Sequence, residues 1–154
     1  MTSPLRLCVR RTSSSEARGS ATLVTLRLPS DVSCIEEAVE LVTRHCLAGH
    51  RTSRTIQFGL RVVLSEALSN AIVRGNGEDL SKWVHVEAEL LPDAIRVSVT
   101  DEGHGFDPGT VPEPIRPEQL AEAGGRGLFL IRKLVDSVQF NEQGNSICMI
   151  LRRR

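Results

Sequence analysis

The chain has 154 residues, of which 40% are hydrophobic, and 19 Lys and Arg residues balance 19 Asp and Glu residues. This length fits one compact domain and leaves little room for two. A formal net charge of zero excludes the broad positive field that nucleic-acid and acidic-membrane binders normally carry. Proteins or small molecules are therefore the expected partners, with no nucleic acid and no membrane.

We expect the protein in the cytoplasm, because the sequence shows neither a targeting signal nor a disulfide pattern. No apolar run reaches the roughly 20 residues of a membrane-spanning helix, and the N-terminus lacks a signal-peptide pattern. The cysteines contain no CxxC pair, which argues against a zinc knuckle and against a disulfide framework. They are Cys8, Cys34, Cys46 and Cys148.

The N-terminal segment differs in composition from the rest of the chain. Residues 1–20 are rich in Ser, Thr and Arg, and we expect them to form a flexible arm outside a domain that spans residues 21–154. Apolar and polar residues then alternate over residues 22–28, which predicts a half-buried strand that Pro29 ends.

Two helices are predicted next. Ser33 and Glu36 have the spacing of a capping box, and apolar residues recur at helical intervals from there to about Leu47. The apolar positions of residues 55–73 fit the helical period most closely of all, and Gly75 and a second glycine beyond it are expected to end that helix.

The second half of the chain predicts two hairpins, a helix and a long irregular segment. Four of the seven prolines fall within residues 106–124, which is typical of a functional lid. The expected elements are strands over 84–90 and 95–99, a helix over 126–136, and strands over 138–140 and 147–151. The pattern predicts an α+β fold, a two-layer sandwich of helices on one face of a mixed, mostly antiparallel sheet.

Glu66 and Asn70 lie four residues apart on the long second helix, so their side chains share one face. A carboxylate there is suited to general-base work, and the amide oxygen is suited to a hard cation such as Mg²⁺. Taken alone, the pair also fits an alternative without chemistry, in which Glu66 lies at the edge of the surface and Asn70 at the end of the helix.

Asp101 continues the inward-facing set of the strand before it and is followed by Gly103 and Gly105. Glycines there allow a planar ligand to approach the backbone beside an acceptor-only carboxylate. An adenine amino group is one suitable donor. The same residues also fit a plain turn after a strand.

A glycine-rich turn leads directly into the helix predicted at residue 126. It contains Gly125, Arg126, Gly127 and Leu128. Free backbone N–H groups at a helix N-terminus bind anions, although tight turns use glycine without any ligand. The P-loop and the dinucleotide-binding fingerprint are both missing from the sequence.

Together, the three segments resemble a known superfamily. Residues 66–71 (EALSNA) resemble the N box of the GHKL ATP-binding superfamily, residues 101–106 (DEGHGF) its first glycine box, and residues 125–131 (GRGLFLI) its second. The stretch from Asn70 to Asp79 is similar to anti-sigma-factor serine kinases of the RsbW and SpoIIAB type. The resemblance covers residues 22–152 and implies a Bergerat-type ATP-binding fold.

The resemblance also implies roles for individual residues. It makes Glu66 the general base, Asn70 the ligand of Mg²⁺ and Asp101 the acceptor of the adenine amino group. Gly103 and Gly105 would shape the adenine pocket. The residues expected around the triphosphate are Gly125, Arg126, Gly127 and Leu128.

One position departs from the family pattern. Arg74 stands where the family often has histidine. It could reach a phosphate as a bidentate donor, or it could be a solvated residue at the helix end.

The resemblance implies a protein serine kinase that uses ATP and Mg²⁺. It would phosphorylate a STAS-domain anti-sigma-factor antagonist, sequester a sigma factor and form a homodimer. A second hypothesis is a non-catalytic module of the same fold. In it, ATP binding would control the sequestration of a protein partner, and no phosphate would be transferred. A sensor histidine kinase is disfavoured because the chain is too short to add a phosphoacceptor hairpin.

Overall fold

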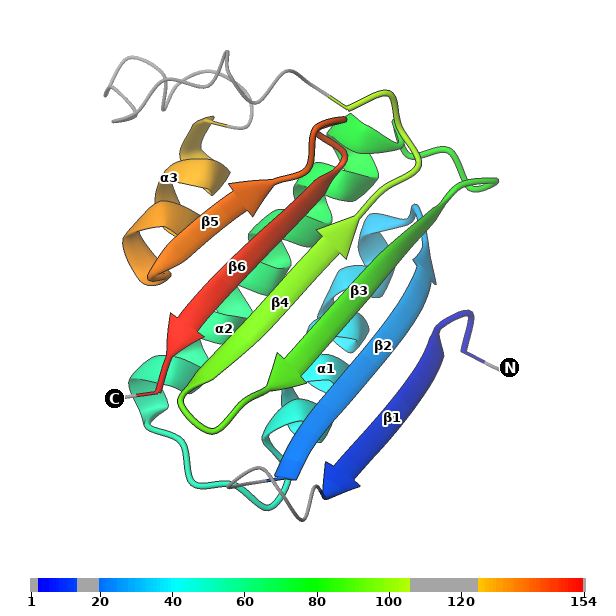
Figure 1. Ribbon diagram of the computed structural model, residues 1–154. Helices are drawn as coiled ribbons and strands as arrows, with labels where there is room; N and C mark the ends of the chain where they lie inside the picture. The colour runs from blue at the N-terminus through cyan, green and yellow to red at the C-terminus, as the bar shows by residue number, and fades with distance from the viewer. Residues whose placement is uncertain (1–2, 14–19, 106–124, 154) are drawn as a thin grey trace.

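Six strands form one antiparallel sheet in the order β1-β2-β3-β4-β6-β5 (Figure 1). The computed structural model describes residues 3–13, 20–105 and 125–153. The strands are β1 (Arg6–Ser13), β2 (Ser20–Pro29), β3 (Trp83–Leu90), β4 (Ala94–Thr100), β5 (Ser137–Phe140) and β6 (Ser146–Arg152). Every strand pairing in these ranges is antiparallel, whereas a mixed sheet was expected.

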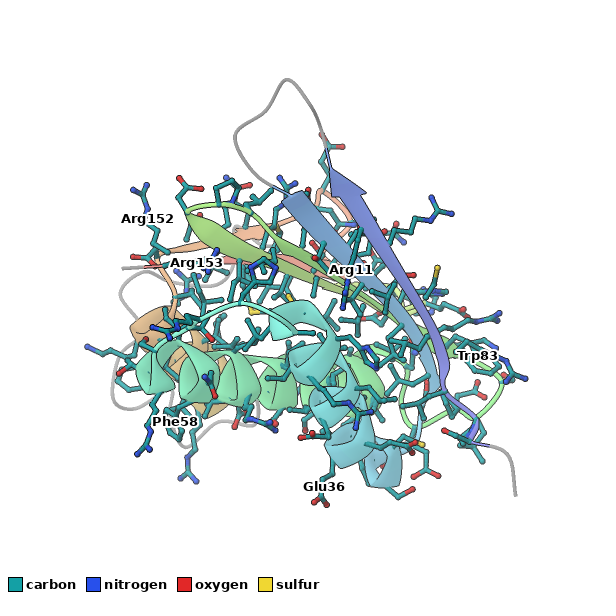
Figure 2. All side chains as sticks on the ribbon, turned by 90° about the horizontal axis from the view of Figure 1, so that it is seen from below. Arg11, Glu36, Phe58, Trp83, Arg152 and Arg153 are labelled. Atoms are coloured by element: carbon teal, nitrogen blue, oxygen red, sulfur yellow. The ribbon has the colours of Figure 1, made fainter. Side chains whose placement is uncertain are left out.

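Helices cover one face of this sheet, as Figure 2 shows from below. They are the short 3-10 helix η1 (Val32–Cys34), α1 (Ile35–Leu47), α2 (Arg54–Ser69), the π-helix η2 (Asn70–Gly75) and α3 (Gly125–Leu134). This arrangement confirms the predicted two-layer α+β fold.

The core lies between the two layers. The inward residues of the strands alternate with solvent-facing ones, and α2 presses fully buried leucines such as Leu60, Leu64 and Leu68 against them. The segment Arg54–Gly75 is, in the described part of the chain, the one helix long and apolar enough to cross a membrane. Its buried leucines belong to this core, so burial against the sheet accounts for its apolar character.

The N-terminal stretch differs from the prediction of a flexible arm. Residues Arg6–Ser13 pair along their whole length with β2, from Arg6 opposite Arg27 to Ser13 opposite Ser20. Leu7 and Val9 pack against the core. The apolar side of this edge strand explains why the segment joins the sheet despite its polar composition.

The start of the first helix differs from its prediction, whereas the second helical segment ends at Gly75 as predicted but changes type on the way. The helical segment begins with Asp31, whose carboxylate accepts hydrogen bonds from the backbone N–H and the hydroxyl of Ser33 at 2.9 and 2.8 Å. Ser33 is therefore a donor to the cap, and the predicted capping box is wrong. At the end of the second helix, the α-helix stops at Ser69 and continues as η2.

The hairpin of β3 and β4, helix α3 and the hairpin of β5 and β6 confirm the predictions for the second half of the chain. The predicted lid, residues 106–124, lies outside the described residues. The roles expected of that segment stay predictions.

Candidate functional site

Helix α3 begins directly against the polar face of α2. A Cβ atom added at Gly127 would lie 2.8 Å from Oε2 of Glu66 and 3.3 Å from Nδ2 of Asn70. Real Cβ atoms essentially never approach another atom within 3.0 Å, so a larger residue at this position would have to displace the end of the Glu66 side chain. The structure thus brings Gly127 next to Glu66 and Asn70, which precede it by 61 and 57 positions in the sequence.

Glu66 and Asn70 are half-buried at this meeting point. Within the described residues, neither side chain has a hydrogen-bond partner or an ion pair. An amide oxygen is among the ligands that Mg²⁺ takes, and Oδ1 of Asn70 lies 3.7 Å from the position of the added Cβ atom. The role of Asn70 as the Mg²⁺ ligand stays a prediction.

The π-helix η2 connects this meeting point to Asp101. It starts at Asn70 and ends at Gly75. A Cβ atom at Gly75 would lie 2.2 Å from Oδ2 of Asp101, and one at Gly103 would lie 2.0 Å from the carbonyl oxygen of Gly75. Two glycines are thus required where the helix end and the turn after β4 touch. π-helical turns occur frequently at functional sites.

Asp101 is half-buried just beyond the end of β4. Its Oδ1 accepts a hydrogen bond from the N–H of Gly103 at 2.8 Å. Its backbone is held by Asn145, whose carbonyl accepts from the Asp101 N–H at 2.9 Å and whose side-chain amide donates to the Asp101 carbonyl at 3.0 Å.

Burial raises the pKa of the Asp101 carboxyl. The hydrogen bond from Gly103 and the nearby charge of Lys82 lower this pKa, but by less than burial raises it. Among the described residues, Oδ1 accepts one hydrogen bond, from Gly103, and Oδ2 faces Gly75. A partly desolvated carboxylate with remaining acceptor capacity is suited to bind a donor such as an exocyclic amino group.

Asn76 is a site residue that the sequence reasoning missed. It is only 3% exposed. Its Oδ1 accepts from the N–H of Glu102 at 2.8 Å, and its Nδ2 donates to Oγ of Ser30 at 2.9 Å and to the carbonyl of Trp83 at 3.0 Å. It therefore ties the turn after Asp101 to β2 and β3. An asparagine between two glycines is typical of a turn, and only the fold shows that this one is buried.

Replacing Asn76 with Ala is expected to lower the free energy of unfolding by about 2–3 kcal/mol, because it leaves the N–H of Glu102 and the carbonyl of Trp83 without their partner. Urea unfolding of the purified protein measures this change. The same substitution at the exposed Gln143 serves as the control and is expected to change stability by less than about 0.5 kcal/mol. Equal effects at the two positions would contradict the role given to Asn76.

Five further residues were predicted to contact the nucleotide. Gly105 has a φ of +77° and packs against the backbone of the β5–β6 turn. Arg126 and Arg74 are exposed, and the described part of the chain offers Arg74 no hydrogen bond or ion pair. Gly125 and Leu128 lie in the first turn of α3. Their roles toward a nucleotide stay predictions.

Comparison with known proteins agrees with this geometry. The pattern of the family described as "Histidine kinase-like ATPase domain" matches residues 28–151, which include Glu66, Asn70, Asp101 and Gly127. The chain belongs to this family. The resemblance to the GHKL superfamily that the sequence predicted is thus confirmed.

Curated relatives carry the name serine-protein kinase RsbW. That of Oceanobacillus iheyensis is 32% identical over 97 residues, which cover 59% of this chain and 61% of the relative. That of Listeria monocytogenes is 35% identical over 98 residues, with 58% and 62% covered. That of Staphylococcus aureus is 33% identical over 97 residues, with 58% and 61% covered. The chain therefore spans about three fifths of the length of these relatives.

Proposed function

We propose that this chain is an ATP-dependent protein serine kinase. The observation that carries the proposal is the convergence of Glu66, Asn70 and Gly127 at the N-terminus of α3. In one place lie a carboxylate, which can act as a base, an amide oxygen, which can bind a cation, and a helix N-terminus, which can bind a phosphate. The serine-protein kinase names of the relatives support the same reaction.

Each residue has a defined task in this proposal. Asp101 accepts a hydrogen bond from the adenine amino group, which fixes the base end of ATP. Asn70 would hold Mg²⁺, which offsets the phosphate charge when it is bound. Glu66 accepts the proton of the acceptor's serine hydroxyl as that oxygen attacks the γ-phosphorus, and ADP is the leaving group.

The proposed partners follow from the resemblance to RsbW-type kinases. They are a STAS-domain anti-sigma-factor antagonist as phosphate acceptor and a sigma factor that the kinase sequesters, with the kinase acting as a cytoplasmic homodimer. Phosphorylation of the antagonist would release it and leave the kinase free to hold the sigma factor.

The test is transfer of labelled γ-phosphate from ATP into proteins of a lysate of the source cells, followed by phosphoamino-acid analysis. A labelled small protein that contains phosphoserine is the expected result. Absence of label while calorimetry still detects ATP binding would contradict phosphotransfer and favour ATP-gated sequestration. Label on histidine would instead indicate a sensor-type kinase.

A further inference from the structure

The loop over residues 76–82, between η2 and β3, is held by hydrogen bonds along most of its length. The carboxylate of Asp79 accepts from the N–H and the hydroxyl of Ser81 at 2.9 and 2.7 Å. The N–H of Lys82 donates to the carbonyl of Asp79 at 2.9 Å, and the Lys82 carbonyl accepts from Oγ of Ser30 at 2.8 Å. With Asn76 buried at its root, the loop has little freedom left.

This constrained loop nevertheless exposes a leucine. Leu80 is 66% exposed, more than any other large hydrophobic side chain in the described part of the chain. Val73 in η2 and Val32 in η1 are also exposed. The hydrogen bonds of Ser30 and Asn76 join the three segments that carry these residues. The segments that carry these exposed apolar side chains are thus held in fixed positions relative to one another.

The backbone of the loop is strained. Glu78 has a φ of +57° and is, within the described ranges, the one residue other than glycine with a positive φ. The left-handed conformation costs a residue with a Cβ on the order of 1 kcal/mol. Such strain persists where the surrounding structure enforces it, and it is concentrated at binding and catalytic sites.

We propose that loop 76–82 is a docking site for a protein partner that inserts Leu80 into an apolar pocket bordered by Lys or Arg side chains. A leucine on a constrained loop is a favourable anchor, because little conformational entropy is lost when it binds. Two exposed acidic residues, Glu78 and Asp79, immediately precede Leu80 in the chain. They favour a basic border on the partner.

The same loop touches the candidate nucleotide site through Asn76, which binds the N–H of Glu102 beside Asp101. If the proposed function is correct, a partner docked on Leu80 lies next to the adenine end of the site. The docking proposal itself needs no phosphotransfer, so the two can fail separately.

The test uses the full chain with the photo-cross-linking residue p-benzoylphenylalanine at position 80, expressed in the source cells. The matched control carries the same residue at Phe58, which is 61% exposed on α2. Figure 2 shows Phe58 on the outer side of the helical layer. Mass spectrometry then identifies the cross-linked peptides.

The expected result is a cross-link from position 80, and not from position 58, to a peptide that carries Lys or Arg beside apolar residues. Glu78→Lys, which leaves the hydrogen bonds of Asp79 to Ser81 in place, should reduce this cross-link at least tenfold, and a Lys→Glu or Arg→Glu change in the identified peptide should restore it. Four outcomes would overturn the proposal: no product at position 80, the same product at both positions, a product with a second copy of this chain, or failure of the charge exchange.

Folding and ATP binding are checked separately with Leu80→Ser. This substitution should leave the thermal midpoint and the ATP affinity measured by calorimetry unchanged, since the side chain is already exposed. A wild-type protein that shows the cross-link but no phosphotransfer would keep the docking proposal and reject the kinase. The reverse pattern would reject the docking site alone.

Discussion

Replacing Asp101 with Asn is expected to weaken ATP binding about tenfold. The substitution removes a charge-assisted hydrogen bond to the adenine amino group, which is worth roughly 1.5 kcal/mol at the low end of its range, and the low end applies because the carboxylate is only half-buried. Calorimetric titration with ATP measures the loss. The folded protein without ATP should be at least as stable as the wild type, because the variant no longer buries a charge.

The direction of the pKa shift fixes how this difference depends on pH. Burial raises the pKa of Asp101, so the folded protein holds the proton more tightly than the unfolded chain does. The free energy of unfolding of the wild type, relative to that of Asp101→Asn, is therefore highest at a pH below the ordinary Asp pKa. This advantage is lost as the pH rises through the raised pKa of the folded protein. ATP binding needs the charged form, so the affinity ratio of wild type to variant should fall as pH decreases, starting at a higher pH than for an ordinary Asp.

The matched control is Asp93→Asn, which removes an exposed carboxylate from the turn between β3 and β4. It should bind ATP as the wild type does at every pH. An Asp101→Asn protein with unchanged ATP affinity would show that this carboxylate does not recognise the adenine.

Replacing Glu66 with Gln is expected to lower the rate of phosphate transfer by a factor of about 10²–10⁴, the usual contribution of a general base. The amide has nearly the same size and so fits beside Gly127, where little space is left. ATP affinity should stay within about twofold of the wild type, because the predicted adenine and Mg²⁺ contacts are made by other residues. Labelled γ-phosphate transfer and calorimetry are measured on the same preparation.

Glu87→Gln is the control for this substitution, because Glu87 is an exposed carboxylate on the solvent-facing side of β3. It should transfer phosphate at the wild-type rate. If Glu66→Gln transferred phosphate as fast as Glu87→Gln, another residue would have to accept the serine proton. If it lost ATP binding, Glu66 would be a binding residue.

The fold could be predicted from the sequence wherever one face of an element is buried. The alternation Val84, Val86, Ala88 and Leu90 fixes both the strand and the side that faces the core. The edge strand β1 escaped prediction because its segment is rich in Ser, Thr and Arg, which is the composition of a loop. The change from α-helix to π-helix after Ser69 could not be predicted, because no proline or other break in the sequence marks it.

The candidate site could be predicted only in part. Helical spacing predicted that Glu66 and Asn70 share one face of the second helix. The two-residue period of the preceding strand predicted that Asp101 faces inward. Gly75 and Asn76 were not, because their importance comes from contacts with the turn after β4, which lies 26 residues from Asn76 in the sequence. A pattern of neighbouring residues cannot predict a contact between residues so far apart in the sequence.

In the proposed function, α2, the turn after β4 and the start of α3 together form an adenine nucleotide site. Calorimetric titration of the wild-type protein with ATP and with GTP, each with Mg²⁺, tests this site most directly. Guanine has a carbonyl oxygen where adenine has the amino group that Asp101 would bind. We expect one ATP bound per chain and GTP binding at least tenfold weaker. Equal affinities, or no binding of ATP, would contradict it.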